Sequence, residues 1–307
     1  MAEMLALIGV TGKKSGGVLA EQISKNLSLV NEIFPGGIRA LVRKSSKTDR
    51  LKSQIKHIQI CSGSLQDIDY LSQSFAGIDT IIHVAGIQYS REIVKAAAAC
   101  RVRRIILVHT TGVYSNFKSA SEEYKHIDND VIRICQSNNL IFTICRPTMI
   151  YGNIYDNNMI KFIKLVDRLP IMPIINGAKY ELQPVHYTDL GEAYFKILLN
   201  EDNTANKEFN LSGGSPISLG TVLTIIGEHL GKRVHFINCP FPIAYAGAWV
   251  LYCLTFRKKD FREKVQRLCE TRTFAFVDAA NAFGYNPIGF KEGIAAEIQE
   301  YMNMKSG

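Results

Sequence analysis

Three glycines near the start of the chain have the spacing of an anion-binding loop. Gly9, Gly12 and Gly16 directly follow an apolar run that begins at Leu5, and a helical pattern begins at Val18. Glycine is needed where a chain turns tightly, where its backbone approaches a pyrophosphate and where a helix packs closely on a strand. The first amides of the helix can then hold the phosphates. The expected pyrophosphate-binding residues are Gly9, Thr11, Gly12, Lys13, Lys14, Ser15 and Gly16.

The spacing G-x-x-G-x-x-x-G differs from the common dinucleotide fingerprint G-x-G-x-x-G. The residues at the end of the second apolar run, which begins at Ile38, therefore help to identify the expected nucleotide. NAD sites place a carboxylate there to accept a hydrogen bond from the ribose 2′-hydroxyl, whereas a 2′-phosphate is bound by Arg. This chain has Arg43, Lys44 and Ser45 at that place and no acid before Asp49. A guanidinium binds phosphate through two parallel hydrogen bonds. The pattern favours NADP over NAD, and a solvated basic loop stays open as the alternative.

Short apolar runs alternate with helical patterns through the first half of the chain. Parallel strands need a crossover connection, so this alternation predicts an α/β fold with a doubly wound parallel Rossmann sheet. Ligands of such sheets bind at the carboxyl ends of the strands. The expected strands are Leu5 to Gly9, Ile38 to Arg43, Ile55 to Cys61, Thr80 to Ala85, Ile105 to His109 and Phe142 to Arg146. The expected helices are Val18 to Leu29, Ile68 to Phe75, Arg91 to Cys100 and Glu122 to Gln136.

The alternation stops after Arg146, which predicts a change of lobe. A polar loop, an amphipathic segment from Met159 to Val166 and a proline-rich stretch follow. The stretch from Val185 to Leu211 has the pattern of one more helix and strand of the sheet. We therefore expect a Rossmann domain from residues 1–152 and 184–212, and a smaller discontinuous substrate lobe from 153–183 and 213–307. Further helices are expected at Leu190 to Leu199, Leu219 to Leu230 and Lys291 to Met302.

Composition excludes several classes of protein. With 47% hydrophobic and 21% charged residues in 307, the chain can form a large core and is not disordered. The seven cysteines are scattered without a Cys-x-x-Cys pair, which predicts reduced thiols in the cytoplasm and no disulfide scaffold. The seven histidines lack metal-ligand spacing, so no metal is expected. The first residues lack a basic leader and a cleavage site, which predicts a cytoplasmic protein without a signal peptide.

The net charge of +8 could attract nucleic acid, an anionic membrane or a phosphorylated ligand. Much of this charge falls between Arg39 and Lys56, where no aromatic residue could stack on bases. We therefore expect a nucleotide phosphate there and no nucleic-acid partner. The longest apolar stretch, Phe241 to Phe256, is shorter than the ~20 residues of a membrane span. Followed by Arg257, Lys258 and Lys259, it is expected to be a buried helix with a solvated basic end, and a helix on a membrane surface is the alternative. No stable membrane insertion is expected.

Several short motifs occur in a specific order along almost the whole chain. They are TGKKSGG (residues 11–17), GSLQD (63–67), HVAG (83–86), HTTGVYS (109–115), RPTMIYG (146–152), QPVHYTDLGEAY (183–194) and AFGYNP (282–287). In this order they resemble the short-chain dehydrogenase/reductase superfamily, specifically its extended and atypical branches with nucleotide-sugar epimerases, dehydratases and NmrA-like proteins. The resemblance implies a small-molecule substrate, such as a nucleotide-linked sugar, and a homodimer. It adds Ser64, Leu65, Val84, Ala85, Gly86, His109, Arg146 and Pro147 to the cofactor site.

Family chemistry needs a hydroxyl that polarises the substrate oxygen, a tyrosine that moves a proton and a lysine four residues after it. The resemblance places the hydroxyl at Thr110, with Thr111 as the alternative, and the tyrosine at Tyr124, 22 residues before Arg146. Four residues after Tyr124 stands Asp128, which would raise the pKa of a phenol. Two literal Tyr-x-x-x-Lys sequences, Tyr114 to Lys118 and Tyr301 to Lys305, fall outside the helix that the chemistry requires and are interpreted as chance.

Substrate contacts are expected from Tyr114, Tyr151, Asn153 and His186. His186 and Asp189 match a family motif, and in the alternative interpretation Asp189 caps a helix while His186 lies in the core. Two functions follow from these patterns. The first is an NADP-dependent oxidoreductase, epimerase or dehydratase that acts on a nucleotide-linked sugar or related carbonyl compound. The second is a catalytically silent NADP(H) sensor of the NmrA-like kind, which the missing lysine suggests.

Overall fold

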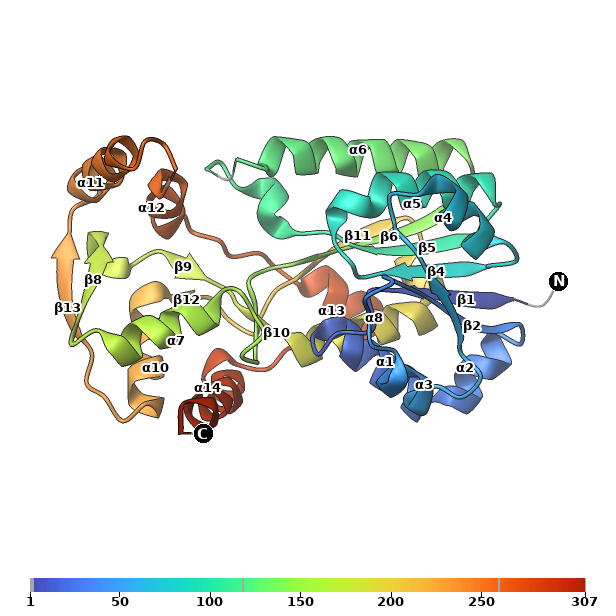
Figure 1. The fold of residues 1–307 in the computed structure, drawn as a ribbon, viewed down its shortest axis with the longest axis horizontal. Helices are drawn as coiled ribbons and strands as arrows, with labels where there is room; N and C mark the ends of the chain where they lie inside the picture. The colour runs from blue at the N-terminus through green and yellow to red at the C-terminus, as the bar shows by residue number, and fades with distance from the viewer. Residues whose placement is uncertain (1–2, 118, 259, 307) are drawn as a thin grey trace.

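A seven-stranded parallel sheet forms the larger lobe of the molecule, on the right in Figure 1. The computed structural model describes residues 3–117, 119–258 and 260–306. The strand order is β11-β6-β5-β4-β1-β2-β3. The chain adds β2 and β3 on one side of β1 and the later strands on the other side, so the topological switch point lies between β1 and β4. Ligands of such sheets bind at the carboxyl ends of the strands near this point. The expected doubly wound parallel sheet is confirmed. The strands are β1 (Met4–Ile8), β2 (Gly37–Val42), β3 (Gln59–Ser62), β4 (Thr80–His83), β5 (Arg104–Val108), β6 (Ile141–Pro147) and β11 (Lys207–Leu211).

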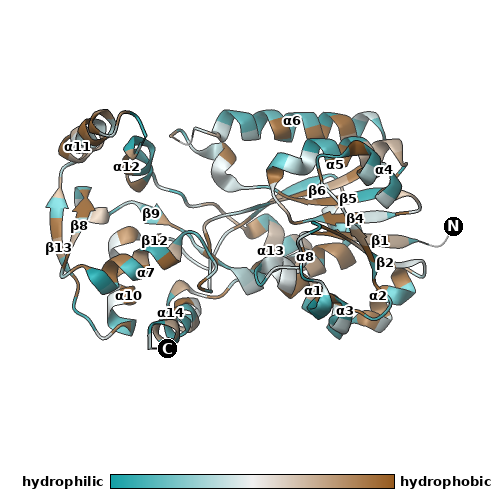
Figure 2. Cartoon of the chain, in the orientation of Figure 1, coloured by the Kyte–Doolittle hydropathy of each residue, from teal (hydrophilic) through white to brown (hydrophobic). Residues whose placement is uncertain are grey.

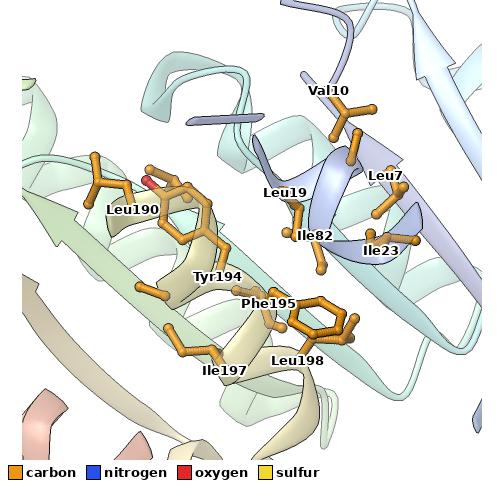
Figure 3. Close-up of a cluster of buried hydrophobic side chains, with 14 of the residues drawn as sticks. Leu7, Val10, Leu19, Ile23, Ile82, Leu190, Tyr194, Phe195, Ile197 and Leu198 are labelled. Atoms are coloured by element: carbon orange, nitrogen blue, oxygen red, sulfur yellow. The ribbon is translucent and has the colours of Figure 1, made fainter. Parts of the chain in front are cut away.

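Helices cover both faces of this sheet and bury two separate apolar clusters. On one face, α1 (Ser15–Lys25) and α8 (Tyr187–Leu199) share one apolar cluster, which includes Leu19, Ile23 and Tyr194 (Figure 3). The same face carries α2 (Leu27–Ile33), α3 (Asp49–Gln54) and α9 (Glu201–Thr204). The other face is covered by α4 (Ile68–Phe75), α5 (Ser90–Ala99) and α6 (Ser121–Ser137), with the short turns η1 (Ile87–Tyr89) and η2 (Thr111–Tyr114) beside them. Apolar residues at helical spacing thus place each helix on the sheet.

The smaller lobe has its own apolar cluster, built from α7 (Met159–Arg168), α10 (Leu219–His229) and α14 (Phe290–Ser306). Short strand pairs flank these helices: β8 (Ile171–Ile175) pairs with β13 (His235–Cys239), and β9 (Glu181–Leu182) pairs with β12 (Ile217–Ser218). The turn η3 (Asn176–Ala178) follows β8. The lobe is therefore assembled from separated stretches of chain, as expected from the break in the alternation.

Two connections join the lobes. A short parallel pair of β7 (Ile150–Tyr151) and β10 (Val185–His186) carries the chain out of the larger lobe and back. Helix α13 (Val277–Phe283) then returns from the smaller lobe and buries Ala279 and Phe283 in the cluster beneath the sheet. This return differs from the expected boundary, which assigned all of 213–307 to the smaller lobe. The apolar side chains of α13 complete the surface of β11 and α8, which would otherwise be exposed.

Two local predictions were wrong. The third strand begins at Gln59 rather than Ile55, because Ile55 ends α3 and His57 has a left-handed backbone with φ of 63°. The apolar stretch at 241–256 does form a helix, α11 (Phe241–Leu254), which packs on α12 (Arg262–Leu268), but it is not buried. Only Ala248 of α11 lies in the interior, because the smaller lobe offers no second layer to cover the rest. Lys259 lies outside the described residues.

Across the described ranges, the helices are too short or too polar to cross a bilayer.

Candidate functional site

The turn after β1 requires glycine at two places. Gly9 has φ of +89°, and a Cβ atom there would lie 2.7 Å from the backbone nitrogen of Ala85 at the end of β4. A Cβ atom on Gly16 would lie 2.2 Å from the carbonyl oxygen of Gly9. The first turn of α1 therefore packs directly on the backbone of the turn that follows β1. Gly12 has no such contact closer than 4.0 Å. Both glycines thus let the start of α1 and the end of β4 approach the turn after β1 closely, as the expected pyrophosphate site requires.

A loop of the smaller lobe reaches this turn. Helix α1 begins at Ser15, which is buried, after Lys14 and without an acidic residue in its first turn. The side-chain amide of Asn153 donates to the carbonyl oxygen of Lys13 over 3.0 Å. Lys13 Nζ also donates to the hydroxyl of Tyr155 over 3.3 Å. Thr11 is half-buried in the same turn. The predicted phosphate-binding turn is thus held by a residue that had been expected to meet substrate.

The predicted basic residues after β2 are exposed. Arg43, Lys44 and Ser45 form a turn in which the Arg43 carbonyl accepts from the Ser46 amide. The sequence interpretation missed a fourth contributor, Arg50 of α3, whose Nη2 donates to the carbonyl oxygen of Gly12 over 3.1 Å. Arg50 was visible only as one member of a basic run, and its reach to residue 12 depends on where α3 lies. A guanidinium therefore stands beside the glycine turn itself.

The ends of β3 and β4 form the next part of the crevice. Ser64 accepts the amide of Gln66 with its hydroxyl, and Leu65 is half-buried beside it. After β4, Val84 and Ala85 are half-buried, and Gly86 has φ of +115°. The ring of His83 holds this turn: Nδ1 accepts from the Ala85 amide at 3.4 Å, and Nε2 donates to the Gly86 carbonyl at 3.0 Å. Burial lowers the pKa of His83 to about 3, so the ring is neutral and this tautomer persists at pH 7.

A buried polar network joins the ends of β5 and β6 to α6. His109 bonds Asp128 through Nδ1 at 2.6 Å and Ser90 through Nε2 at 3.0 Å. Asp128 also accepts from Arg146, at 3.0 Å from Nε and 2.5 Å from Nη2. Arg146 contacts Glu208 of β11 as well. His109 and Arg146 are thus bonded to side chains within the protein, and through Asp128 they join the ends of β5 and β6 to α6.

Asp128 stands where the family tyrosine has its lysine partner, and it is not an isolated negative charge. Burial opposes its ionisation, but His109 and Arg146 overcome this and hold the pKa of Asp128 below its ordinary value. Tyr124 lies one helical turn earlier on the same face of α6 and packs in the apolar cluster of that side of the sheet. The charge near this tyrosine is therefore an Arg–Asp pair instead of a single ammonium group.

The hydroxyl expected to polarise the substrate lies at the start of η2. Thr110 accepts the Gly112 amide at 3.0 Å, and Thr111 is buried and donates to the Pro147 carbonyl. Tyr114, at the end of η2, is 47% exposed, with the Arg146 guanidinium 5.7 Å above its ring and Phe274 5.3 Å away. Since Phe274 comes from the segment that returns from α12, Tyr114 lies where the two lobes meet.

Two other expected substrate residues lie in the interior of the smaller lobe. Tyr151 is fully buried, and its ring packs against Phe290 and His186. His186 bonds the Thr188 hydroxyl at 2.6 Å, and burial lowers the pKa of His186 to about 4. The expectation that Asp189 caps α8 was wrong, because its carboxylate accepts from the Ile288 amide at 3.1 Å and makes no cap bond. Burial raises the pKa of Asp189 to about 6.

The two literal Tyr-x-x-x-Lys sequences differ in what can be said of them. Lys118 lies outside the described residues, so the first pair has no described geometry. Tyr301 and Lys305 both donate to Asp167, at 2.8 and 2.6 Å, which gives them a structural role at the end of α14. Within residues 3–117, 119–258 and 260–306, no three His, Cys, Asp or Glu side chains gather as metal ligands would.

Comparison with known proteins agrees with this geometry. A family model described as NAD(P)H-binding matches residues 28–163. The chain is 24% identical over 204 residues to the 40 kDa subunit of the mitochondrial NADH-ubiquinone oxidoreductase of Neurospora crassa, which covers 66% of this chain and 50% of that protein. It is 20% identical over 282 residues to an N-acetyl-alpha-D-glucosaminyl-diphospho-ditrans,octacis-undecaprenol 4-epimerase of Escherichia coli O157:H7, covering 79% and 84%. The chain thus spans half the length of the first relative and most of the second.

Solved structures share the fold over almost the whole chain. The dTDP-glucose 4,6-dehydratase of Streptomyces venezuelae, described with NAD bound, has a TM-score of 0.72 at 15% identity, covering 99% of this chain and 98% of that one. The UDP-glucose 4-epimerase of Thermotoga maritima has a TM-score of 0.70 at 14% identity, covering 98% and 99%. An NADPH-dependent quinone oxidoreductase of Escherichia coli reaches 0.70 at 15% identity, covering 98% and 100%. Residues 28–163 therefore match an NAD(P)H-binding family model, and the chain shares its fold with these dehydratase, epimerase and oxidoreductase structures.

Proposed function

We propose that the chain is an NADP-dependent oxidoreductase or epimerase-type enzyme that acts on a nucleotide-linked sugar or a related carbonyl compound. The observation that carries the proposal is the glycine turn: Gly9 and Gly16 each exclude a Cβ atom, at 2.7 and 2.2 Å from backbone. Such close backbone packing at the first turn of a parallel sheet serves a bound pyrophosphate. Arg43, Lys44 and Ser45 follow β2, and Arg50 adds a second guanidinium nearby. Together these cations suit the 2′-phosphate of NADP.

When bound, the nicotinamide would supply or accept a hydride. The chain's part is then to orient the substrate oxygen and to move one proton. Thr110, which already accepts the Gly112 amide, keeps its own O–H available to donate to that oxygen. Tyr124 would give the proton to the oxygen during reduction or take it during oxidation. In either direction the phenol oxygen exchanges one proton with the substrate oxygen while the hydride moves to or from the nicotinamide.

The cofactor proposal is tested by titrating the protein with NADPH and NADH and following nucleotide fluorescence. We expect tighter binding of NADPH, and Arg43→Ala should weaken NADPH by roughly tenfold while it leaves NADH nearly unchanged. Lys95→Ala, on the exposed face of α5, is the matched loss of one surface cation. Equal loss of both nucleotides in Arg43→Ala, or equal affinity of the parent protein for both, would contradict the assignment to NADP.

The catalytic proposal is tested with Tyr124→Phe, assayed for nucleotide oxidation with carbonyl substrates of the proposed class. The variant should bind NADPH like the parent and turn over at least roughly a hundredfold more slowly, because only the proton donor is removed. Tyr114→Phe, at the more exposed hydroxyl of the crevice, is the matched control. An unchanged rate in Tyr124→Phe, with a loss in Tyr114→Phe, would assign the proton transfer to Tyr114 instead.

A second candidate is a cofactor-binding protein without turnover. Asp128, locked to Arg146 at 2.5 Å in the place of the family lysine, favours it. The matched relative of Neurospora crassa is itself named as a subunit of a larger oxidoreductase. This candidate predicts tight NADPH binding, unequal affinity for the oxidised and reduced nucleotide and no turnover with any carbonyl substrate. A measurable kcat that depends on Tyr124 would dismiss it.

A further inference from the structure

Helix α11 is the most apolar exposed element of the molecule. Its fourteen residues, FPIAYAGAWVLYCL, include no charged side chain, yet only Ala248 is buried. Ile243 is 63% exposed, Trp249 53% and Leu254 72%, and Phe256 just beyond the helix is 87% exposed. Exposed apolar patches of this kind mark a surface that contacts a membrane or another molecule. Figure 2 shows the apolar colouring of α11 at the end of the smaller lobe farthest from the N-terminus.

The exposed side chains lie on one face. At helical spacing, Ile243, Val250 and Leu254 project together, opposite the half-buried residues that pack toward the lobe. The half-buried inward side includes Phe241, Tyr245 and Ala244, and Ala244 lines an apolar groove together with Leu165 and Met172. The outward face of α11 is therefore apolar, whereas the outward face of an ordinary surface helix is polar.

Positive charge follows this helix directly. Residues 255–272 contain seven Lys or Arg and three Asp or Glu. Asp260 pairs with Arg262 at 2.7 Å and Glu263 with Arg267 at 3.9 Å, so two of the three acids are locally neutralised. Arg257 and Lys258 are exposed beside Leu254 and Phe256. The apolar face thus ends at a cationic rim.

Further contacts keep this rim next to the apolar helix. The Arg262 guanidinium lies 4.0 Å above the ring of Tyr252, in the last turn of α11, and Lys264 Nζ lies 4.6 Å from the ring of Phe261. Aromatic rings with an apolar body and a polar tip favour the boundary between lipid and water, as does the exposed Trp249. Helices that lie in this boundary combine such an apolar face with flanking Lys and Arg.

We propose that α11 and the basic segment behind it form a docking surface for an anionic lipid bilayer. The helix would lie in the plane of the interface, with Ile243, Val250 and Leu254 among the acyl chains and Arg257 and Lys258 at the phosphates. Anionic lipid attracts each basic residue near its surface by ~1 kcal/mol. A second copy of this chain is the poorer occupant, because a two-fold contact through α11 would bring two cationic rims together.

Trp249 is the single tryptophan of the chain, so the helix reports its own environment. The full protein is mixed with vesicles of phosphatidylcholine alone or with phosphatidylglycerol added, and both co-sedimentation and tryptophan emission are followed. We expect binding and a blue shift of the emission with phosphatidylglycerol, and roughly tenfold weaker binding without it or at high salt. Brominated acyl chains should quench the emission of bound protein.

Two pairs of variants separate the apolar from the electrostatic contribution. Ile243→Gln with Leu254→Gln should lower partition roughly tenfold, and Ile68→Gln, at a 48% exposed position of the larger lobe, should not. Arg257→Glu with Lys258→Glu should abolish the preference for phosphatidylglycerol, whereas Lys95→Glu on α5 should keep it. All these positions are exposed, so near-parental melting temperatures are expected and are measured first.

Three results would overturn the proposal. Emission unchanged by anionic vesicles, or partition equal in all variants, would show that α11 does not enter lipid. A blue shift that depends on protein concentration without vesicles, together with a doubled mass in solution, would assign the face to a second copy. None of these readouts depends on nucleotide binding or turnover, so the outcome is independent of the proposed enzyme function.

Discussion

The side-chain amide of Asn153 donates a hydrogen bond over 3.0 Å to the backbone carbonyl of Lys13, and so ties the first loop of the smaller lobe to the glycine turn. Asn153 is 7% exposed, and its side-chain oxygen accepts the amide of Tyr155. The position of the smaller lobe is thereby linked to the conformation of the turn that we propose to bind pyrophosphate.

Asn153→Ala should lower the free energy of unfolding by ~1 kcal/mol, since one buried hydrogen bond is lost and Lys13 keeps an unpaired carbonyl. Asn153→Asp should weaken NADPH binding further, because a carboxylate replaces a donor next to the expected phosphates. Nucleotide titration and thermal melting measure both effects. Equal nucleotide affinity in the parent and in Asn153→Asp would separate this loop from the cofactor site.

Gly9→Ala should destabilise the fold and abolish nucleotide binding, because its Cβ atom would collide with Ala85 at a φ that only glycine adopts easily. Gly12→Ala is the matched control, since no atom lies closer than 4.0 Å to the new methyl group. We expect it to melt like the parent. If Gly12→Ala melts like the parent but binds NADPH more weakly, the new methyl group interferes with the bound nucleotide and not with the fold. A stable Gly9→Ala that still binds would refute this account of the turn.

Asp128→Asn should lower the free energy of unfolding by about 2 to 4 kcal/mol, because it leaves the buried Arg146 with one fewer anionic partner and disturbs His109. Asp130→Asn, two residues later on the same helix, breaks half-exposed pairs with Arg91 and Arg133. Its cost should stay below ~1 kcal/mol. Urea unfolding of both variants makes the comparison, and similar midpoints would contradict the importance of the buried network.

Glu297 provides a prediction about pH. Burial, with Asp156 nearby, raises the pKa of Glu297 to about 10 from an ordinary value near 4.5. The folded protein therefore keeps this proton where the unfolded chain loses it, and stability falls as pH rises from about 4.5 toward 10. Glu297→Gln keeps the shape and the acceptor for the Gly152 amide, at 2.7 Å, without a titrating proton.

The variant should melt like the parent near pH 4 and at higher temperature than the parent at pH 8, with a difference that grows with pH. Glu300→Gln, on the same helix and bonded to the Ile154 amide, controls for the loss of a carboxylate. Parallel pH profiles for the parent and Glu297→Gln would show that Glu297 is ionised in the folded state.

Much of the larger lobe follows from sequence because its signals are local. Helix α4 is predicted to the residue, since Asp67 caps it and its apolar residues recur at helical spacing. The parallel order follows from strands separated by helices. Chemistry that depends on distant partners does not follow: Asp128 was interpreted as an isolated charge, and only the meeting of α6 with β6 reveals Arg146 beside it.

The smaller lobe shows the limit of composition as a guide. The apolar stretch of sixteen residues from Phe241 to Phe256 predicts burial, but burial needs a covering layer, and whether one is present depends on the rest of the lobe. The reach of Arg50 to Gly12 likewise depends on how α3 is placed. The Asn153 contact joins residues 140 positions apart in the chain, which no local pattern can indicate.

The return of α13 to the sheet has a practical consequence. Since Ala279 and Phe283 complete the core beneath β11, after the chain has already built most of the smaller lobe, neither lobe is a continuous polypeptide. A truncation before residue 277 would remove part of the interior of the larger lobe. Fragments cut at the lobe junction should therefore expose apolar surface and aggregate. The two lobes are expected to fold and unfold together.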